Sequence, residues 1–119
     1  MLKLDKVSKV FGTTTALHPT DLSVPEGRTT VLIGPSGCGK STLLRLMINL
    51  IRPDSGSVLF DDMTFAPAET LILRRRMGYV IQDGGLFPHL TARANAAIVA
   101  RYLGWSQQRL RDRLAELTR

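Results

Sequence analysis

The sequence predicts an α/β fold, and three consecutive stretches carry this prediction. Residues 28–33, RTTVLI, include β-branched residues and are typical of a short buried strand. A glycine-rich loop follows over residues 34–39. After the loop, apolar side chains recur at helical spacing, at positions 43, 47 and 50 and at positions 44, 48 and 51. The order strand, loop, helix therefore predicts an α/β unit with the loop between its two elements.

The loop matches a phosphate-binding pattern. Residues 34–42, GPSGCGKST, fit G-x-x-x-x-G-K-[ST] at every fixed position. Glycines lack Cβ atoms, so the backbone can take positive φ values and turn its N–H groups toward an anion. We expect Lys40 to reach the β- and γ-phosphates and the Ser41 hydroxyl to ligate a bridging Mg²⁺, with the helix dipole directed at the phosphates. The other loop residues expected to bind nucleotide are Gly34, Ser36, Gly37, Cys38, Gly39 and Thr42.

Length and composition exclude several classes of protein. The 119 residues suffice for one small domain, and 44% apolar content argues against disorder. Cys38 is the single cysteine, which excludes an internal disulfide and favours a reducing compartment. No apolar run approaches the ~18 residues that span a bilayer, and the N-terminus is too polar for a secretory signal. The net charge of +6 suits phosphate ligands, nucleic acid or anionic lipid, but we interpret the late arginines, at positions 109, 111, 113 and 119, as solvated charge and expect no nucleic-acid partner.

The other strands and helices are predicted from alternating apolar and polar residues, from apolar residues at helical spacing and from turn residues. Further strands are predicted over residues 2–11, 16–24, 58–60 and 77–81, and further helices over residues 68–76, 91–103 and 107–117. Thr91 and Ser106 are the expected caps of the last two helices. Asp61 and Asp62 are interpreted as a polar turn. The loop over residues 82–90 carries the apolar pair Leu86 and Phe87.

The order of these parts resembles the nucleotide-binding domain of ABC transporters. Residues 34–45, GPSGCGKSTLLR, are similar to the Walker A segment of that family almost letter for letter. Phe11 stands where the family has an aromatic residue that stacks on adenine, and Gln82 where the family has its Q-loop glutamine. The resemblance implies a P-loop NTPase (RecA-like) core with an N-terminal antiparallel β part and the start of a helical subdomain. The β part and Walker A core would cover about 1–81, and the Q-loop and helical start about 82–119.

The resemblance also implies a function. The chain would be an ATP-binding subunit that couples Mg-ATP binding and hydrolysis to solute transport through membrane subunits. Gln82 would join Ser41 at the Mg²⁺ or contact the attacking water, and Leu86 and Phe87 would touch the permease. A second ATP-binding subunit would complete a dimer, at the cytoplasmic face of the cell membrane. Residues 74–95 look most like importers of betaine and related osmoprotectants, or of amino acids.

The resemblance covers only the first half of the family's domain. The chain has no LSGGQ-like signature, no apolar strand ending in Asp-Glu and no later switch histidine. We therefore expect a truncated chain or gene fragment without catalytic residues of its own, which binds ATP better than it hydrolyses it. Such a piece is expected to be weakly stable or to self-associate when alone.

The residues by themselves are also compatible with two other functional classes. One is a different P-loop NTPase, such as a nucleotide kinase or a DNA-acting ATPase, although the strands before the loop count against a kinase. The other is a nucleotide-binding module without turnover.

Overall fold

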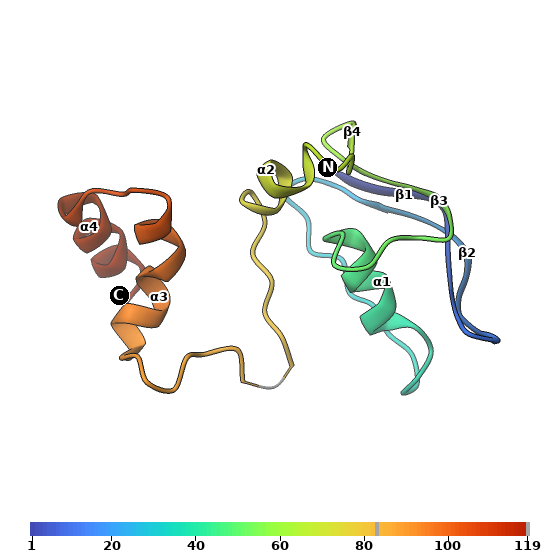
Figure 1. The fold of residues 1–119 in the computed structure, drawn as a ribbon, viewed down its shortest axis with the longest axis horizontal. Helices are drawn as coiled ribbons and strands as arrows, with labels where there is room; N and C mark the ends of the chain where they lie inside the picture. Colours follow the sequence, from blue (N-terminus) through green and yellow to red (C-terminus); the bar gives the residue numbers. More distant parts are fainter. Residues whose placement is uncertain (83, 119) are drawn as a thin grey trace. The chain divides into compact units, whose positions relative to one another are not determined.

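The protein is described by a computed structural model that covers residues 1–82 and 84–118 and divides into two compact units (Figure 1). The first unit is Met1–Gly78, and the second begins at Tyr79. Asp83 of the predicted loop and the basic residue Arg119 lie outside the described residues.

The first unit contains a four-stranded antiparallel sheet with the order β2-β1-β3-β4 (Figure 1). The strands are β1 (Leu2–Phe11), β2 (Thr14–Val24), β3 (Ser55–Phe60) and β4 (Met63–Thr64). The predicted N-terminal antiparallel β part is confirmed. Asp61 and Asp62 form the turn between β3 and β4, with positive φ angles of 49° and 62°. Two such residues give the turn the twist that a tight hairpin needs.

A bulge in β1 explains why buried and exposed side chains do not alternate regularly along this strand. Leu4 and Val7 are both buried although they are three residues apart, because the pairing register shifts between them and Lys6 has a φ of 47°. The amide of Lys6 donates to the Asp21 carboxylate at 2.8 Å. On the β3 side, a Cβ on Gly56 would lie 2.3 Å from the carbonyl oxygen of Asp5, so that strand can approach the bulge only with glycine there.

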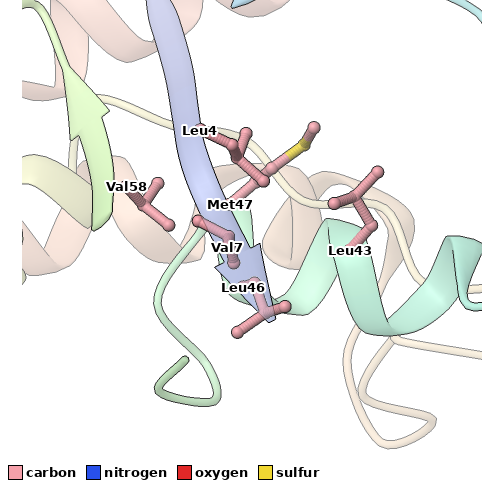
Figure 2. Close-up of a cluster of buried hydrophobic side chains, with 6 residues drawn as sticks. All are labelled: Leu4, Val7, Leu43, Leu46, Met47 and Val58. Carbon is pink, nitrogen blue, oxygen red and sulfur yellow. The ribbon is translucent and has the colours of Figure 1, made fainter. Parts of the chain in front are cut away.

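The core of the first unit joins helix α1 (Lys40–Met47) to the sheet (Figure 2). Its buried side chains are Leu4, Val7 and Val58 from the strands and Leu43, Leu46 and Met47 from α1. Val7 and Leu46 are completely buried. Removing such apolar surface from water is the main favourable term in folding. The core therefore fixes on the sheet the helix that begins directly after the glycine-rich loop.

Helix α2 (Thr70–Arg74) contacts the C-terminal end of α1. Arg74 donates through its Nε to the carbonyl oxygen of Ile48 at 3.0 Å and through a terminal nitrogen to the carbonyl oxygen of Asn49. A cation at these carbonyls opposes the negative end of the α1 dipole. The predicted helix over residues 68–76 is shorter than expected, because its first residues form turns in which the amides of Glu69 and Thr70 donate to Ala66.

The second unit is built on the helices α3 (Ala92–Tyr102) and α4 (Gln107–Leu117). Thr91 Oγ1 accepts from the amide of Ala94 at 3.2 Å, and Ser106 Oγ accepts from the amide of Arg109 at 3.3 Å. Both predicted caps are confirmed. Ala97 and Leu110 are the buried apolar residues of the two helices. Among the described residues, no helix has the length and apolar character needed to cross a membrane.

Two predicted strands are wrong. Residues 28–33 and 77–81 have no strand structure, and Ile33 and Val80 are 92% and 94% exposed. A strand exists only where a neighbour accepts its backbone hydrogen bonds, and no described segment pairs with either stretch. The apolar sequence of both stretches was recognised, but the pairing that makes a strand is absent from the described sheet.

Candidate phosphate-binding site

The glycine-rich loop leads directly into α1 and needs glycine at its last position. Gly39 is the N-cap of α1, with a φ of 94°, and its carbonyl oxygen accepts from the amide of Leu43 at 2.8 Å. A Cβ on Gly39 would lie 2.7 Å from the carbonyl oxygen of Ala16 in β2. Gly37 also has a positive φ, of 81°, but open space around it. The loop is thus packed against the hairpin at one glycine and free to bend at another.

The N-terminus of α1 has the properties of an anion site. No side chain caps its first turn, and the first turn carries no acidic residue. The first amides of a helix lack partners within the helix, and the dipole adds positive potential there. A phosphate group fits this end of the helix, because it would receive these hydrogen bonds and meet no negative side chain from the first turn.

Lys40 lies over the loop. Its Nζ donates to the carbonyl oxygens of Gly34 and Pro35, both at 2.7 Å, and lies 3.3 Å from Cys38 Sγ. A Cβ on Gly34 would lie 2.7 Å from the same sulfur, so the loop closes tightly around this point. The ammonium group is therefore held at the loop, where it can exchange a carbonyl oxygen for a phosphate oxygen.

The other predicted loop residues differ in exposure. Ser36, Cys38 and Ser41 are exposed, whereas Thr42 is half-buried. In the part of the chain that the structure describes, no group of three His, Cys, Asp or Glu side chains could hold a metal ion. The exposed hydroxyl of Ser41, next to Lys40, is an oxygen donor of the type that Mg²⁺ accepts alongside phosphate oxygens. The loop thus fits a metal bound jointly by phosphate and protein.

Phe11 lies at the end of the hairpin that packs against the loop. Its ring is half exposed, and it pairs with Thr14 in the register that joins β1 to β2. Ala16, which contacts Gly39, is two residues further along β2. Phe11 therefore pairs with the same end of β2 that lies against the loop at Gly39. Gln82, by contrast, is exposed and belongs to the second unit.

Two charged residues beside Phe11 were missed by the sequence analysis. Lys9 Nζ lies 5.4 Å from the centroid of the Phe11 ring and 2.9 Å from Asp54 Oδ1. The other Asp54 oxygen accepts from the amide of Val10 at 2.7 Å. This amide, together with the ammonium of Lys9, holds the pKa of Asp54 below its ordinary value. No local pattern signals a contact between residues more than forty positions apart.

In the second unit, one asparagine holds the segment that carries Leu86 and Phe87. Asn95 of α3 accepts from the amide of Phe87 at 2.7 Å and donates to the carbonyl oxygens of Phe87, Leu90 and Thr91. Leu86 is 71% exposed and Phe87 is 49% exposed. The pair is therefore an exposed apolar surface on a backbone that α3 holds in place.

The family model described as ABC transporter matches residues 17–119. The chain belongs to the ABC transporter family. This membership confirms the resemblance drawn from the Walker A segment, and it does not favour the nucleotide kinase or the DNA-acting ATPase. ABC ATP-binding proteins are ATPases.

Relatives of this ABC chain include ATP-binding proteins of uptake systems. The glycine betaine/carnitine/choline transport ATP-binding protein OpuCA of Bacillus subtilis is 42% identical, over 98% of this chain and 31% of its own length. The osmoprotectant import ATP-binding protein OsmV of Salmonella typhimurium is also 42% identical, with coverages of 98% and 32%. The glycine betaine uptake system ATP-binding protein YehX of Escherichia coli is 44% identical, with coverages of 98% and 38%. The chain thus spans about a third of the length of these relatives.

Solved ABC cassettes share the fold. The ATP-binding cassette MJ0796, in a dimeric post-hydrolysis state bound to ADP and phosphate, superposes with a TM-score of 0.84 at 32% identity. The match covers 98% of this chain and 55% of that one. CbiO1 from Clostridium perfringens, part of an ABC transporter complex, gives a TM-score of 0.84 at 26% identity over 97% of this chain. The predicted P-loop NTPase fold class is therefore confirmed.

Proposed function

We propose that this chain is the ATP-binding part of an ABC importer subunit, which binds Mg-ATP at residues 34–42. The observation that carries the proposal is the uncapped N-terminus of α1, fixed by the core and preceded by the glycine-rich loop. Binding energy for a triphosphate comes from many aligned donors, and this arrangement supplies backbone amides, a dipole and the Lys40 ammonium together.

Each predicted residue has a role in this proposal. Phe11 would stack on the adenine, the amides of residues 37–42 would donate to the phosphates, and Lys40 would neutralise their charge. A bound Mg²⁺ supplies further positive charge to the phosphate oxygens. Ser41 would hold it together with Gln82, whose exposure leaves its amide oxygen accessible. The remaining loop residues, Gly34, Ser36 and Cys38, would keep the loop compact.

We further propose that hydrolysis needs groups beyond this chain. Phosphoryl transfer depends on positioning the attacking water and stabilising charge, and the predicted site residues of this chain, Phe11, residues 34–42 and Gln82, include no carboxylate for either role. Purified as these 119 residues, the chain is expected to bind Mg-ATP without appreciable turnover. The rest of a complete subunit, together with a second ATP-binding subunit in a dimer, would supply these groups.

The proposed partner surface for a permease is the exposed pair Leu86 and Phe87. Apolar side chains on a backbone held by Asn95 lose little entropy on docking, which favours a specific contact. The subunit would then act at the cytoplasmic face of the cell membrane. From the names of OpuCA, OsmV and YehX, we propose quaternary-amine osmoprotectants as the cargo class. Uptake of labelled betaine that persists after deletion of the gene would contradict this cargo.

The binding proposal is tested by titrating Mg-ATP into the purified chain by calorimetry, with a thermal melt in parallel. Ligand at about 100 times its dissociation constant should stabilise the fold by about 2.7 kcal/mol. Lys40→Ala should remove most of this shift, whereas Lys3→Ala, which removes an exposed charge from β1, should keep it. Equal ATP affinity in wild type and Lys40→Ala would refute the phosphate-binding assignment.

A further inference from the structure

The end of β1 that carries Phe11 extends beyond its neighbour on one side. Pairing between β1 and β3 stops at Ser8 and Ser55, so β3 offers no partner to the backbone of Val10. Asp54, one residue before β3, takes that place: its Oδ2 accepts from the Val10 amide at 2.7 Å. Its own amide donates to the carbonyl oxygen of Ser8 at 3.0 Å. A side chain thus continues the ladder where the strand has ended.

The same carboxylate also holds the cation beside the ring. Asp54 Oδ1 lies 2.9 Å from Lys9 Nζ, and the Lys9 side chain is only 15% exposed. The ammonium in turn lies 5.4 Å from the Phe11 ring centroid, within the range of a cation–π contact. One side chain therefore restrains both the backbone before Phe11 and a group against its ring.

We propose that Asp54 is a positioning residue that presents the Phe11 ring to the base of the nucleotide, through Val10 and Lys9. The inference rests on the proposed ATP-binding function and extends it to the base end of the site. Asp54 follows α1, whose last turn is closed by bonds from Leu50 and Ile51 to the carbonyl oxygen of Arg45. Asp54 thereby connects α1, which begins at the proposed phosphate site, with β1, which ends at the residue proposed to stack on the base.

The proposal separates base recognition from phosphate recognition. Asp54 does not touch the glycine-rich loop in any described contact, so loss of its charge should leave the phosphate end intact. Stacking of a base on an aromatic ring depends on the ring being held in one place before the ligand arrives. A ring without its restraints must be ordered on binding, and that entropy reduces affinity. We therefore expect Asp54 to affect ligands that carry a base and not those that lack one.

The test compares Mg-ATP with Mg-tripolyphosphate, which has no base, by calorimetry on the whole chain. Phe11→Ala is expected to weaken ATP binding by about tenfold, in line with the usual size of base–aromatic stacking. Asp54→Asn should weaken ATP binding by roughly fivefold, as a part of the same stacking contribution, and leave tripolyphosphate unchanged. Lys9→Met should have an effect in the same direction.

Two further variants distinguish positioning from simple loss of structure. Asp21→Asn neutralises another carboxylate that accepts a β1 amide, that of Lys6 at 2.8 Å, and should change the affinity for neither ATP nor tripolyphosphate. In a Phe11→Ala background, Asp54→Asn should cause no additional loss of ATP affinity, because its effect passes through the ring. A general loosening of the sheet would instead remain visible in that background.

The outcomes are separable from those of the ATP-binding proposal. If wild type binds both ligands and Asp54→Asn lowers both affinities equally, or neither, the positioning role is wrong while ATP binding stands. If wild type binds tripolyphosphate as tightly as ATP, the base contributes nothing and the inference fails at Phe11. If wild type binds neither ligand, the ATP-binding proposal fails and this inference fails with it.

Discussion

Gly39 faces the carbonyl oxygen of Ala16 so closely that a Cβ on the glycine would lie 2.7 Å from that oxygen. This contact joins the phosphate-binding loop to β2 at a backbone angle that L side chains rarely adopt, a φ of 94°. Real Cβ atoms do not approach a carbonyl oxygen so closely, and a backbone atom cannot move aside cheaply. The loop and the strand must therefore separate if the glycine is replaced.

We expect Gly39→Ala to lower both stability and ATP affinity, and Gly37→Ala is the matched control. Both residues have positive φ angles, so each substitution costs about 1–2 kcal/mol of backbone strain. Only Gly39→Ala adds the clash with Ala16, because Gly37 has open space. Urea unfolding and ATP titration of both variants measure the difference. Equal losses of stability in the two would show that the contact with β2 is not what requires glycine.

The second prediction concerns the core that anchors α1. Leu46 is completely buried, and Leu46→Ala should cost about 2–5 kcal/mol of unfolding free energy, as cavity-forming substitutions do. The total free energy of unfolding of a small domain is only about 5–15 kcal/mol, so the variant should melt broadly or remain partly unfolded. Leu44→Ala, at a position 43% exposed on the same helix, should cost much less. A similar denaturation midpoint for the two variants would contradict the packing of α1 on the sheet.

The third prediction is a loss of stability in acid. The Val10 amide and then the Lys9 ammonium lower the pKa of Asp54, while the N-terminal amine and then Arg76 lower the pKa of Asp61. A carboxyl with a lowered folded-state pKa stabilises the fold fully above its ordinary value of 3.8, and the contribution disappears as pH falls through the lower folded value. Stability should therefore rise with pH across this acid range.

The acid prediction is measured by urea unfolding at a series of pH values, with Asp54→Asn and Asp61→Asn as the test variants. Each variant lacks one titrating group, so its stability should depend less steeply on pH in the acid range than that of wild type. A wild-type profile that is flat below the ordinary carboxyl pKa, or variants as steep as wild type, would show that these ion pairs do not contribute to stability.

Local sequence signals predicted the elements whose cause is local. Thr91 and Ser106 were recognised as helix caps because the hydroxyl reaches an amide three residues along, which needs no distant partner. The loop before α1 was predictable for the same reason, since Gly39 caps the helix and Lys40 contacts the carbonyl oxygens of Gly34 and Pro35, all within a few residues. Strand β1 was also found, although its bulge at Lys6 disturbs the alternation.

Features that depend on partners far away in the chain could not be predicted from the sequence. Residues 28–33 and 77–81 have the composition of strands but lack a strand, because pairing is a property of the neighbours and not of the segment. Asp54 lies in residues 52–57, RPDSGS, whose composition is typical of a turn, and only the fold brings it to Val10 and Lys9. A single sequence does not contain such contacts, so the glycine-rich loop before α1 was predictable and the contacts of Asp54 with Val10 and Lys9 were not.

The last prediction concerns Asn95 and the proposed permease surface. Its side chain accepts from the Phe87 amide and donates to three carbonyl oxygens of the segment 87–91. Asn95→Ala should remove all four contacts and free this segment, whereas Asn95→Asp keeps the acceptor for Phe87 and loses the donors. Hydrogen exchange at the Phe87 amide should therefore accelerate strongly in the first variant and less in the second. Neither should change ATP affinity, because none of these contacts involves a residue that we propose to bind the nucleotide or the Mg²⁺. Unchanged exchange in Asn95→Ala would mean that the asparagine does not hold Leu86 and Phe87 in place, and the argument for a preformed docking surface would be lost.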